Sequence, residues 1–347
     1  MTVRSRIGIS LPMLNQPAHR LRDLAHLADT AGLDSLWDYE FYRNPFITHA
    51  LNATVTDRIT LATGIATACS RSPFEMANAA ADVDELSGGR ALIGTSVGGA
   101  GWTEIFNGAD IDRPLPRMRE YVAAMRAVWD HFATGEPFLH EGEFGWAASP
   151  PFNPWGVREL VRPRIPIYLA GLKPGMLRLA GEIGDGVLGF LNTPSFVADH
   201  VLPHVAEGAA RAGRKPDEID VTSLIICSIS EDRDEARRLA RINVGNYVAY
   251  PVGETVVEYM GLQEDRDAVV KALFSEGPQA LEHVTSDALL RTFSICGTPD
   301  EALEQFAEFD GLLPHIVLHT PYVPPISGPE SAAAFEATVR TFARELH

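Results

Sequence analysis

The residues of this sequence best suited to chemistry form a short run of aromatic and acidic side chains, Trp37 to Arg43 (WDYEFYR). Two carboxylates, Asp38 and Glu40, alternate with the aromatic residues of this run. A flat conjugated ring with polar edges would be held well here, because aromatic side chains cover its faces and carboxylates accept hydrogen bonds from its edge. The alternative is that Trp37 and Phe41 fill a hydrophobic core and that the acids around them are exposed.

Glycines in two further segments would let the backbone approach such a ring closely. Gly64 interrupts the β-branched run 59–68, which indicates a bulge or a ligand in contact, although a packing glycine would look the same. Gly98 and Gly99 end another apolar run, and Glu104 follows them as a third candidate acid. Their backbone amides could face a ligand, but a flexible loop needs the same residues.

A third segment is typical of a phosphate-binding loop. Residues 171–176 (GLKPGM) stand immediately before a predicted helix at 177–182. Free amides at the N-terminus of a helix bind phosphate, and Lys173 adds positive charge. An ordinary Gly-Pro turn is the alternative. The residues that we expect at this site are Gly171, Leu172, Lys173, Gly175 and Met176.

Three rival motifs are weaker. Residues 94–98 fit the G-x-S-x-G pattern of a hydrolase, which would make Ser96 a nucleophile, but more glycines follow where that fold needs a helix. His200 and His204 are one helical turn apart, yet Pro203 lies between them and no H-E-x-x-H pattern exists. We therefore predict no metal site. The first strand lacks the G-x-G-x-x-G pattern of a nicotinamide site.

The elements that must position these residues alternate between strands and helices. Helical spacing of apolar residues is clear at 20–30, 74–86 and 115–132. Eight predicted strands alternate with helices of this kind. This alternation favours parallel pairing of the strands, and right-handed crossovers close them into a (β/α)8 TIM barrel of the α/β class. The predicted strands are Arg6–Pro12, Leu33–Glu40, Ile59–Ala68, Arg90–Val97, Ile165–Ala170, Gly186–Leu191, Ile219–Ile229 and His315–Thr320.

We expect a single domain over residues 1–347, because the two long gaps read as insertions after strands four and seven rather than as linkers. They cover about 134–164, which we expect to be a hairpin and loop, and 244–292, which is mostly helical. In a barrel of this kind the site lies in the loops that follow the strands. The candidate residues all follow strand ends, so they should converge on one mouth.

The composition narrows the class of partner. A formal charge of −17 argues against nucleic acid and anionic membranes, because both need clustered Lys and Arg. The three cysteines, Cys69, Cys227 and Cys296, are odd in number and far apart, which fits a reduced cytoplasm. The N-terminal residues resemble neither a secretion signal nor a membrane span. A cytoplasmic enzyme acting on a small molecule is therefore expected.

Four blocks of the sequence resemble the bacterial luciferase superfamily of flavin- and deazaflavin-dependent oxidoreductases. The SGGR block at 87–90 with its strand marks the superfamily. The other blocks are similar to its methylenetetrahydromethanopterin reductase branch: residues 166–171 (PIYLAG), 176–187 (MLRLAGEIGDGV) and 293–300 (FSICGTPD). The resemblance runs from about Arg6 to Tyr322.

The resemblance implies a (β/α)8 barrel, a homodimer or higher homo-oligomer, and hydride transfer to or from the deazaflavin coenzyme F-420. It implies a cis peptide at Gly64-Ile65 that backs the cofactor ring together with Ala66, and cofactor phosphate at residues 171–176. One departure concerns the proton. Related deazaflavin enzymes carry Asp-His where this chain has Glu40-Phe41, so Glu40, Asp38 or Glu104 would have to serve as proton donor or acceptor.

Three other functions remain open at this point. The first is an FMN-dependent monooxygenase that takes reduced flavin from a partner and activates oxygen. The second is a non-catalytic carrier of the cofactor, since a fold does not imply a function. The third is the serine hydrolase that would use Ser96.

Overall fold

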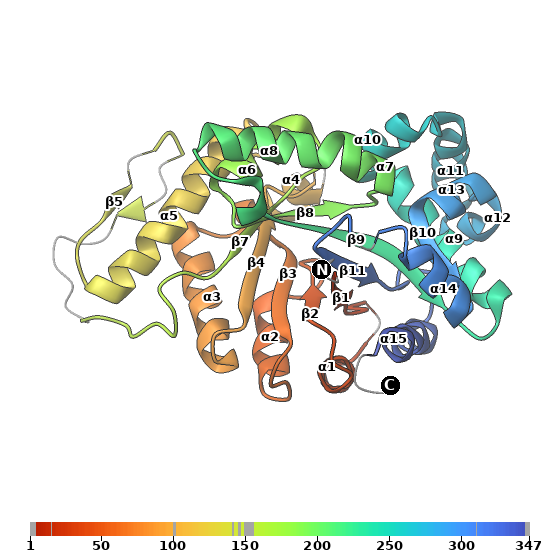
Figure 1. The fold of residues 1–347 in the computed structure, drawn as a ribbon, viewed down its shortest axis with the longest axis horizontal. Helices are drawn as coiled ribbons and strands as arrows, with labels where there is room; N and C mark the ends of the chain where they lie inside the picture. The colour runs from red at the N-terminus through yellow and green to blue at the C-terminus, as the bar shows by residue number, and fades with distance from the viewer. Residues whose placement is uncertain are drawn as a thin grey trace.

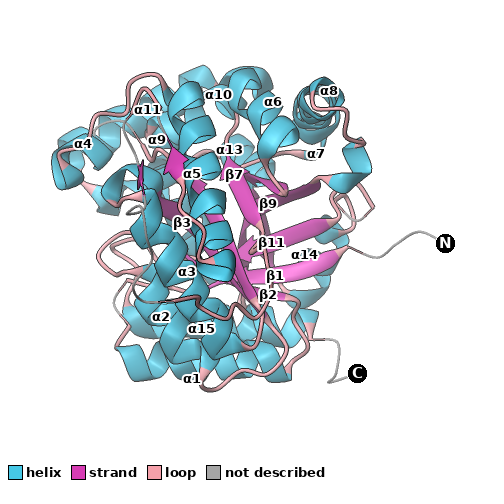
Figure 2. Cartoon of the chain, turned by 90° about the vertical axis from the view of Figure 1, so that its left-hand side faces the viewer, coloured by secondary structure: helices cyan, strands magenta, loops and turns pink. Residues whose placement is uncertain are grey.

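The fold is known from a computed structural model, which describes residues 5–14, 16–99, 102–140, 142–144, 147–148, 156–309 and 311–343. Its centre is a closed barrel of eight parallel strands (Figures 1 and 2). The strand order is β1-β2-β3-β4-β7-β8-β9-β11, and β11 pairs back with β1. The predicted (β/α)8 barrel is therefore confirmed. The strands are β1 (Arg6–Ser10), β2 (Ser35–Asp38), β3 (Thr60–Thr67), β4 (Ala91–Ser96), β7 (Ile167–Ala170), β8 (Gly186–Phe190), β9 (Asp220–Ile229) and β11 (His315–His319).

Helices surround the barrel, as Figure 2 shows. Local signals set their ends. Ser72 caps α3 by accepting a hydrogen bond from the Glu75 amide, and Gly88 ends it at a φ of 68°, which glycine adopts at no steric cost. The SGGR block thus ends α3 and leads directly into β4. The longer helices are α1 (Ala18–Thr30), α2 (Pro45–Ala53), α3 (Pro73–Ser87), α5 (Pro114–Thr134), α6 (Pro174–Ile183), α8 (Leu202–Arg211), α9 (Arg233–Ala249), α14 (Pro299–Phe306) and α15 (Gly328–Phe342).

Side chains fill the barrel in layers. The middle layer is apolar and consists of Trp37, Ala62, Leu92, Tyr168, Leu188, Leu224 and Val317. Below it, at the N-terminal end of the strands, Asp220 contacts Arg6 and the Tyr168 hydroxyl and lies 3.7 Å from His315 Nδ1. Burial alone would raise the pKa of Asp220, but contacts with His315, Tyr168 and Arg6 lower it to about 2. This end of the barrel is closed by a charged network.

The segment 134–164 follows α5 in the chain. Within it, β5 (Leu139–His140) and β6 (Ala147–Ala148) pair as an antiparallel hairpin, on the left in Figure 1. The Glu120 carboxylate of α5 accepts hydrogen bonds from the amides of Glu143 and Phe144, and the Arg117 guanidinium lies 4.3 Å from the Phe144 ring centre. The predicted hairpin therefore lies against α5.

The segment 244–292 is helical, as expected. It contains the end of α9, α10 (Pro251–Met260), α11 (Gln263–Glu276), α12 (Leu281–Val284) and most of α13 (Asp287–Phe293). Several elements were not predicted from the sequence, among them β10 (Ser294–Gly297), which pairs with β9 outside the barrel, α2, α4 (Trp102–Asn107), α14 and α15. The division into one domain with two insertions remains a prediction. No helix among the described residues has both the length and the apolar character needed to cross a bilayer.

Candidate active site

A bulge in β3 shapes one side of the C-terminal mouth. Gly64 pairs with Gly94 and Ala66 with Thr95, so Ile65 is an extra residue without a partner in β4. The Gly64-Ile65 peptide is cis, as the resemblance predicted. Gly64 and Ile65 are half-buried while Ala66 is buried. The bulge therefore presents bare backbone and one apolar side chain to the mouth.

Trp37 supports this bulge from below. Its side chain is fully buried, and its indole N–H donates to Ser35 Oγ at 2.7 Å. A Cβ on Gly64 would lie only 2.9 Å from Trp37 Cε3, which explains the glycine at this position. Trp37 thus belongs to the layer beneath the mouth. Its burial favours the interpretation that Trp37 fills the core over the interpretation that it covers a ligand.

Glu40 holds the bulge in place. Its amide donates to the Ile65 carbonyl at 3.0 Å, and its carboxylate accepts from the Thr67 amide at 2.7 Å and from Ser70 Oγ at 3.1 Å. The Arg71 guanidinium adds a bidentate pair at 2.8 and 2.9 Å. Both oxygens of Glu40 are therefore engaged by residues that follow the bulge, while its amide is bonded to the bulge at Ile65.

Asp38 points the other way. Alternation along β2 turns its side chain outward to α2, where His49 Nε2 lies 2.9 Å from Oδ1. The same nitrogen is hydrogen-bonded to the Ala62 carbonyl at 3.0 Å, so the carboxylate gains a close contact but no hydrogen bond among the described residues. Burial raises the pKa of Asp38, and His49 acts against this. The structure does not bring Asp38 to the mouth.

The loop after β4 borders the mouth beside the bulge. Gly98 has a φ of 89°, and a Cβ there would lie 2.1 Å from Thr103 Oγ1. The Thr103 amide donates to the Gly99 carbonyl at 3.0 Å and so closes the loop onto α4. Gly99 has open space where a Cβ would be, and Glu104 is exposed on α4. Among the described residues, no histidine contacts Ser96, so the hydrolase motif lacks its base.

The loop 171–176 ends in the N-terminus of α6. The Gly171 amide donates to Leu188, but the amides of Leu172 and Gly175 have no acceptor in the described part of the chain, as expected in the first turn of a helix. Lys173 is exposed at the N-cap position, whereas Met176 is buried and packs where a Cβ on Gly171 would be. The arrangement is a helix N-terminus with an adjacent cation, which suits an anion.

His200 and His204 pack behind this loop. His200 Nε2 is hydrogen-bonded to the Leu172 carbonyl at 3.1 Å, and its ring stacks on Phe196 at 4.5 Å. Burial lowers the pKa of His200. The described residues include no group of three or more His, Cys, Asp or Glu side chains that could hold a metal ion. Through its hydrogen bond to the Leu172 carbonyl, His200 holds the loop 171–176 in place.

Most of a cluster of rings at the mouth was not predicted from the sequence. Its residues come from the ends of β1, β2, β8 and β11, from α9, and from the loop after β11: Ser10, Tyr39, Phe190, Tyr247, His319 and Tyr322. We call them the aromatic cluster. His319 Nδ1 is hydrogen-bonded to Ser10 Oγ at 2.7 Å and its Nε2 to the Tyr247 hydroxyl at 3.2 Å, and Tyr247 contacts the Tyr322 hydroxyl. Tyr39 belongs to the aromatic run 37–43, and the only sequence signal for the other residues was a histidine at the end of a predicted strand.

Burial makes the aromatic cluster electrically neutral. It lowers the pKa of His319 to about 3, with no charged group contributing to the shift. It also raises the pKa values of Tyr39, Tyr247 and Tyr322. At neutral pH the imidazole and the phenols are therefore uncharged.

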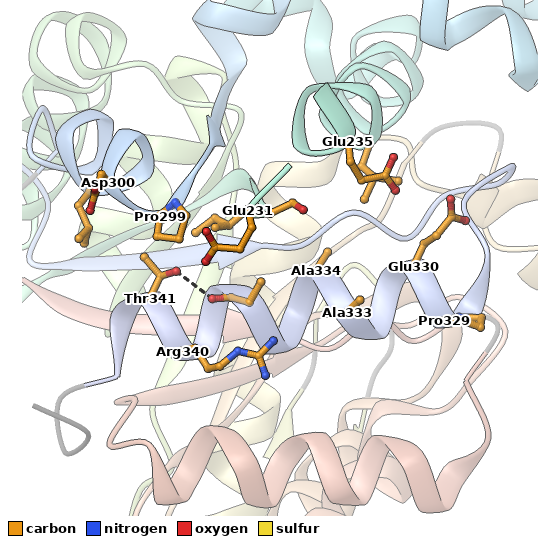
Figure 3. Close-up of a pocket in the computed structure, with 15 residues that line it drawn as sticks. Glu231, Glu235, Pro299, Asp300, Pro329, Glu330, Ala333, Ala334, Arg340 and Thr341 are labelled. Carbon is orange, nitrogen blue, oxygen red and sulfur yellow. Dashed lines mark hydrogen bonds between the residues drawn. The ribbon is translucent and has the colours of Figure 1, made fainter. Parts of the chain in front are cut away.

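A separate cavity of about 840 Å³ lies outside the barrel, between α9, α14 and α15. Figure 3 shows Glu231, Asp300 and Arg340 around it. None of the candidate residues from the strand ends lines this cavity. Its position does not connect it to the mouth.

The fold and the mouth define a (β/α)8-barrel protein with a bulged third strand and, after the fifth strand, a helix N-terminus beside an exposed lysine. Residues 4–315 match the family model described as luciferase-like monooxygenase, and the chain belongs to this family.

Named relatives share most of the chain. It is 34% identical over 300 residues to a 5,10-methylenetetrahydromethanopterin reductase of Archaeoglobus fulgidus, which covers 84% of this chain and 86% of that protein. A reductase of the same name from Methanolobus tindarius is 31% identical over 303 residues, with 85% and 87% covered. The solved structure of the coenzyme F-420-dependent tetrahydromethanopterin reductase of Methanopyrus kandleri is 26% identical, with a TM-score of 0.80 over 97% and 98% of the two chains.

Proposed function

We propose that this protein is an oxidoreductase that binds coenzyme F-420 and transfers a hydride between this deazaflavin and a small organic substrate. The observation that carries the proposal is the pairing of two features on one mouth: the half-buried bulge at Gly64-Ile65 and the unpaired amides at the start of α6. The relatives named above support this cofactor class.

The residues present fit a cofactor with a flat ring and a phosphate. The bare backbone of Gly64 and the Ile65 side chain offer a surface for the ring, with Trp37 beneath them. The amides of Leu172 and Gly175 offer donors for the phosphate, and Lys173 offers charge. When bound, the deazaflavin supplies the carbon that takes or gives the hydride. The loop at Gly98 and Gly99 would border the ring next to the bulge.

The three candidate acids take different parts. Glu40 acts as a positioning residue, because its amide is bonded to the Ile65 carbonyl and its carboxylate binds the residues that follow the bulge, Thr67, Ser70 and Arg71. Asp38 lies behind the sheet and adds only a buried charge contact with His49. Glu104 is the exposed acid of the three and keeps the proposed role of proton donor or acceptor. Glu104→Gln should lower turnover while cofactor affinity stays unchanged, and wild-type turnover would remove this role.

Titration of the apoprotein with F-420 and with FMN, followed by absorbance and fluorescence, tests the cofactor. We expect F-420 to bind and FMN to bind much more weakly. Lys173→Glu should weaken F-420 binding by about tenfold, since it reverses a charge beside the phosphate. Lys215→Glu is the matched control, because Lys215 is also exposed but precedes β9 at the opposite end of the barrel.

The second candidate is an FMN-dependent monooxygenase, which the description of the matching family favours. Tight FMN binding without F-420 binding supports it and contradicts our proposal. A carrier would bind F-420 but never accelerate its reduction above the uncatalysed rate. A cytoplasmic location and a homodimer or higher homo-oligomer are part of the proposal.

A further inference from the structure

We infer that the aromatic cluster is the substrate side of the mouth and that it selects an uncharged molecule with a flat apolar body and a hydrogen-bond-accepting oxygen, such as a carbonyl. This inference rests on the proposed function, because that function places the cofactor ring against the β3 bulge.

The bulge and the aromatic cluster lie next to each other at the C-terminal end of the barrel. Tyr39 and Glu40 are consecutive, and the Glu40 amide is bonded to the Ile65 carbonyl of the bulge. Ile65 and Phe190 also pack against the same interior layer of the barrel. A substrate that touches the cluster would therefore lie next to a ring held on Ile65.

The rings offer faces to a flat molecule. Tyr39, Phe190 and Tyr247 are half-buried, whereas His319 and Tyr322 lie buried behind them. Phe190 meets Tyr247 edge to face at 4.5 Å, and Tyr39 packs against Tyr322 at 5.0 Å. Such tilted walls favour contact with a planar apolar body.

Electrostatics favours an uncharged molecule. The imidazole and phenols are neutral, and Glu40, the neighbouring carboxylate in the chain, is already paired with Arg71. A charged substrate would lose its hydration here and gain no opposite charge, which is costly. A neutral substrate avoids this cost.

The polar centre of the cluster supplies the hydrogen bond. The Tyr247 hydroxyl lies between His319 Nε2 and the Tyr322 hydroxyl, so its orientation is fixed by two neighbours. The Tyr39 hydroxyl is buried beside the Tyr322 hydroxyl and the Met13 backbone. These hydroxyl groups can donate to an acceptor oxygen, and none of them requires a charge on the ligand.

Three isosteric probes test the selection by charge: benzamide, benzoate and benzamidinium, which carry charges of about 0, −1 and +1. Their affinities are measured by NMR titration of the full chain loaded with oxidised F-420. We expect benzamide to bind about tenfold more tightly than either ion. Equal or tighter binding of an ion, or no binding of benzamide, overturns the inference.

Two conservative variants test the residues. Tyr247→Phe and Tyr322→Phe keep the rings and should each weaken benzamide about fivefold, the effect of one hydrogen bond, while F-420 affinity stays unchanged. Tyr168→Phe is the matched control: it removes a buried hydroxyl at the opposite end of the barrel and should leave benzamide binding unchanged. Wild-type benzamide affinity in both Tyr247→Phe and Tyr322→Phe overturns the inference. Failure of F-420 to bind would contradict the proposed function. It is distinguishable from failure of the inference, because the same probes can also be titrated into the apoprotein.

Discussion

Each end of β11 carries a histidine that is hydrogen-bonded to a serine of another strand, but the two histidines have opposite surroundings. His315 begins the strand and is hydrogen-bonded to Ser35 at 2.7 Å, and His319 ends it and is hydrogen-bonded to Ser10 at 2.7 Å. His315 faces Asp220 and Arg6, whereas His319 faces only phenols and an apolar ring. The lower end has paired charges that close the barrel. The upper end has neutral donors, which is what a binding site for an uncharged ligand requires.

The largest expected effect is that of acid on His319. Burial lowers the pKa of His319 to about 3 in the folded protein. In the unfolded chain this histidine takes up a proton near pH 6.5, whereas in the folded protein it stays neutral at that pH. The stability that His319 contributes is therefore complete above pH 6.5 and is lost as the pH falls toward 3. The loss in the free energy of unfolding reaches about 4 kcal/mol. Urea unfolding between pH 7 and 3 measures it.

The control for this prediction is His319→Gln. Burial also lowers the pKa values of His200 and His315, so the wild-type profile combines several groups. The decrease in the pH dependence of the free energy of unfolding in His319→Gln gives the contribution of His319. An unchanged pH profile in this variant contradicts the neutral state assigned to the upper end.

The charged end should respond most to removal of its acid. Asp220→Asn leaves Arg6 without its partner and should lower the free energy of unfolding by about 3 kcal/mol. Asp217→Asn, an exposed acid just before β9, should change it by less than about 0.5 kcal/mol. Chemical denaturation compares the two. F-420 affinity of the folded protein should stay the same in both, and a loss in Asp220→Asn would show that the lower end takes part in binding.

The Glu40–Arg71 pair extends the comparison into the mouth itself. It is charged and fully paired like Asp220, so we expect it to support structure rather than to transfer protons. Arg71→Met leaves Glu40 unpaired and should lower stability by about 2 kcal/mol and weaken F-420 binding roughly tenfold, because the bulge loosens. Glu75→Gln is the control, since it removes only the half-exposed outer partner of Arg71. Wild-type F-420 affinity in Arg71→Met would separate the bulge from cofactor binding.

The difference between fold and site explains what could be predicted from the sequence. The barrel follows from local signals, because each strand is an apolar run and helix stops such as Gly88 need only their neighbours. Alternation along β2 could also have excluded Asp38, since Trp37 faces inward and the next residue must face outward. The pairing of Glu40 with Arg71 depends on a bulge, and no local pattern encodes it. The aromatic cluster joins residues from Ser10 to Tyr322, so only the closed barrel reveals it.

The smallest expected effect comes from the two serines, and it tests the comparison most directly. Ser35→Ala removes the acceptor of the Trp37 indole as well as the partner of His315, so two buried groups lose a bond. Ser10→Ala removes the partner of His319 alone. We expect Ser35→Ala to be less stable than Ser10→Ala by about 1 kcal/mol, the worth of one buried hydrogen bond. Only Ser10→Ala should also weaken benzamide binding, because of the two histidines only His319 is hydrogen-bonded to Tyr247. The reverse order of stability, or an equal effect on benzamide, would show that the two ends of β11 do not differ in role.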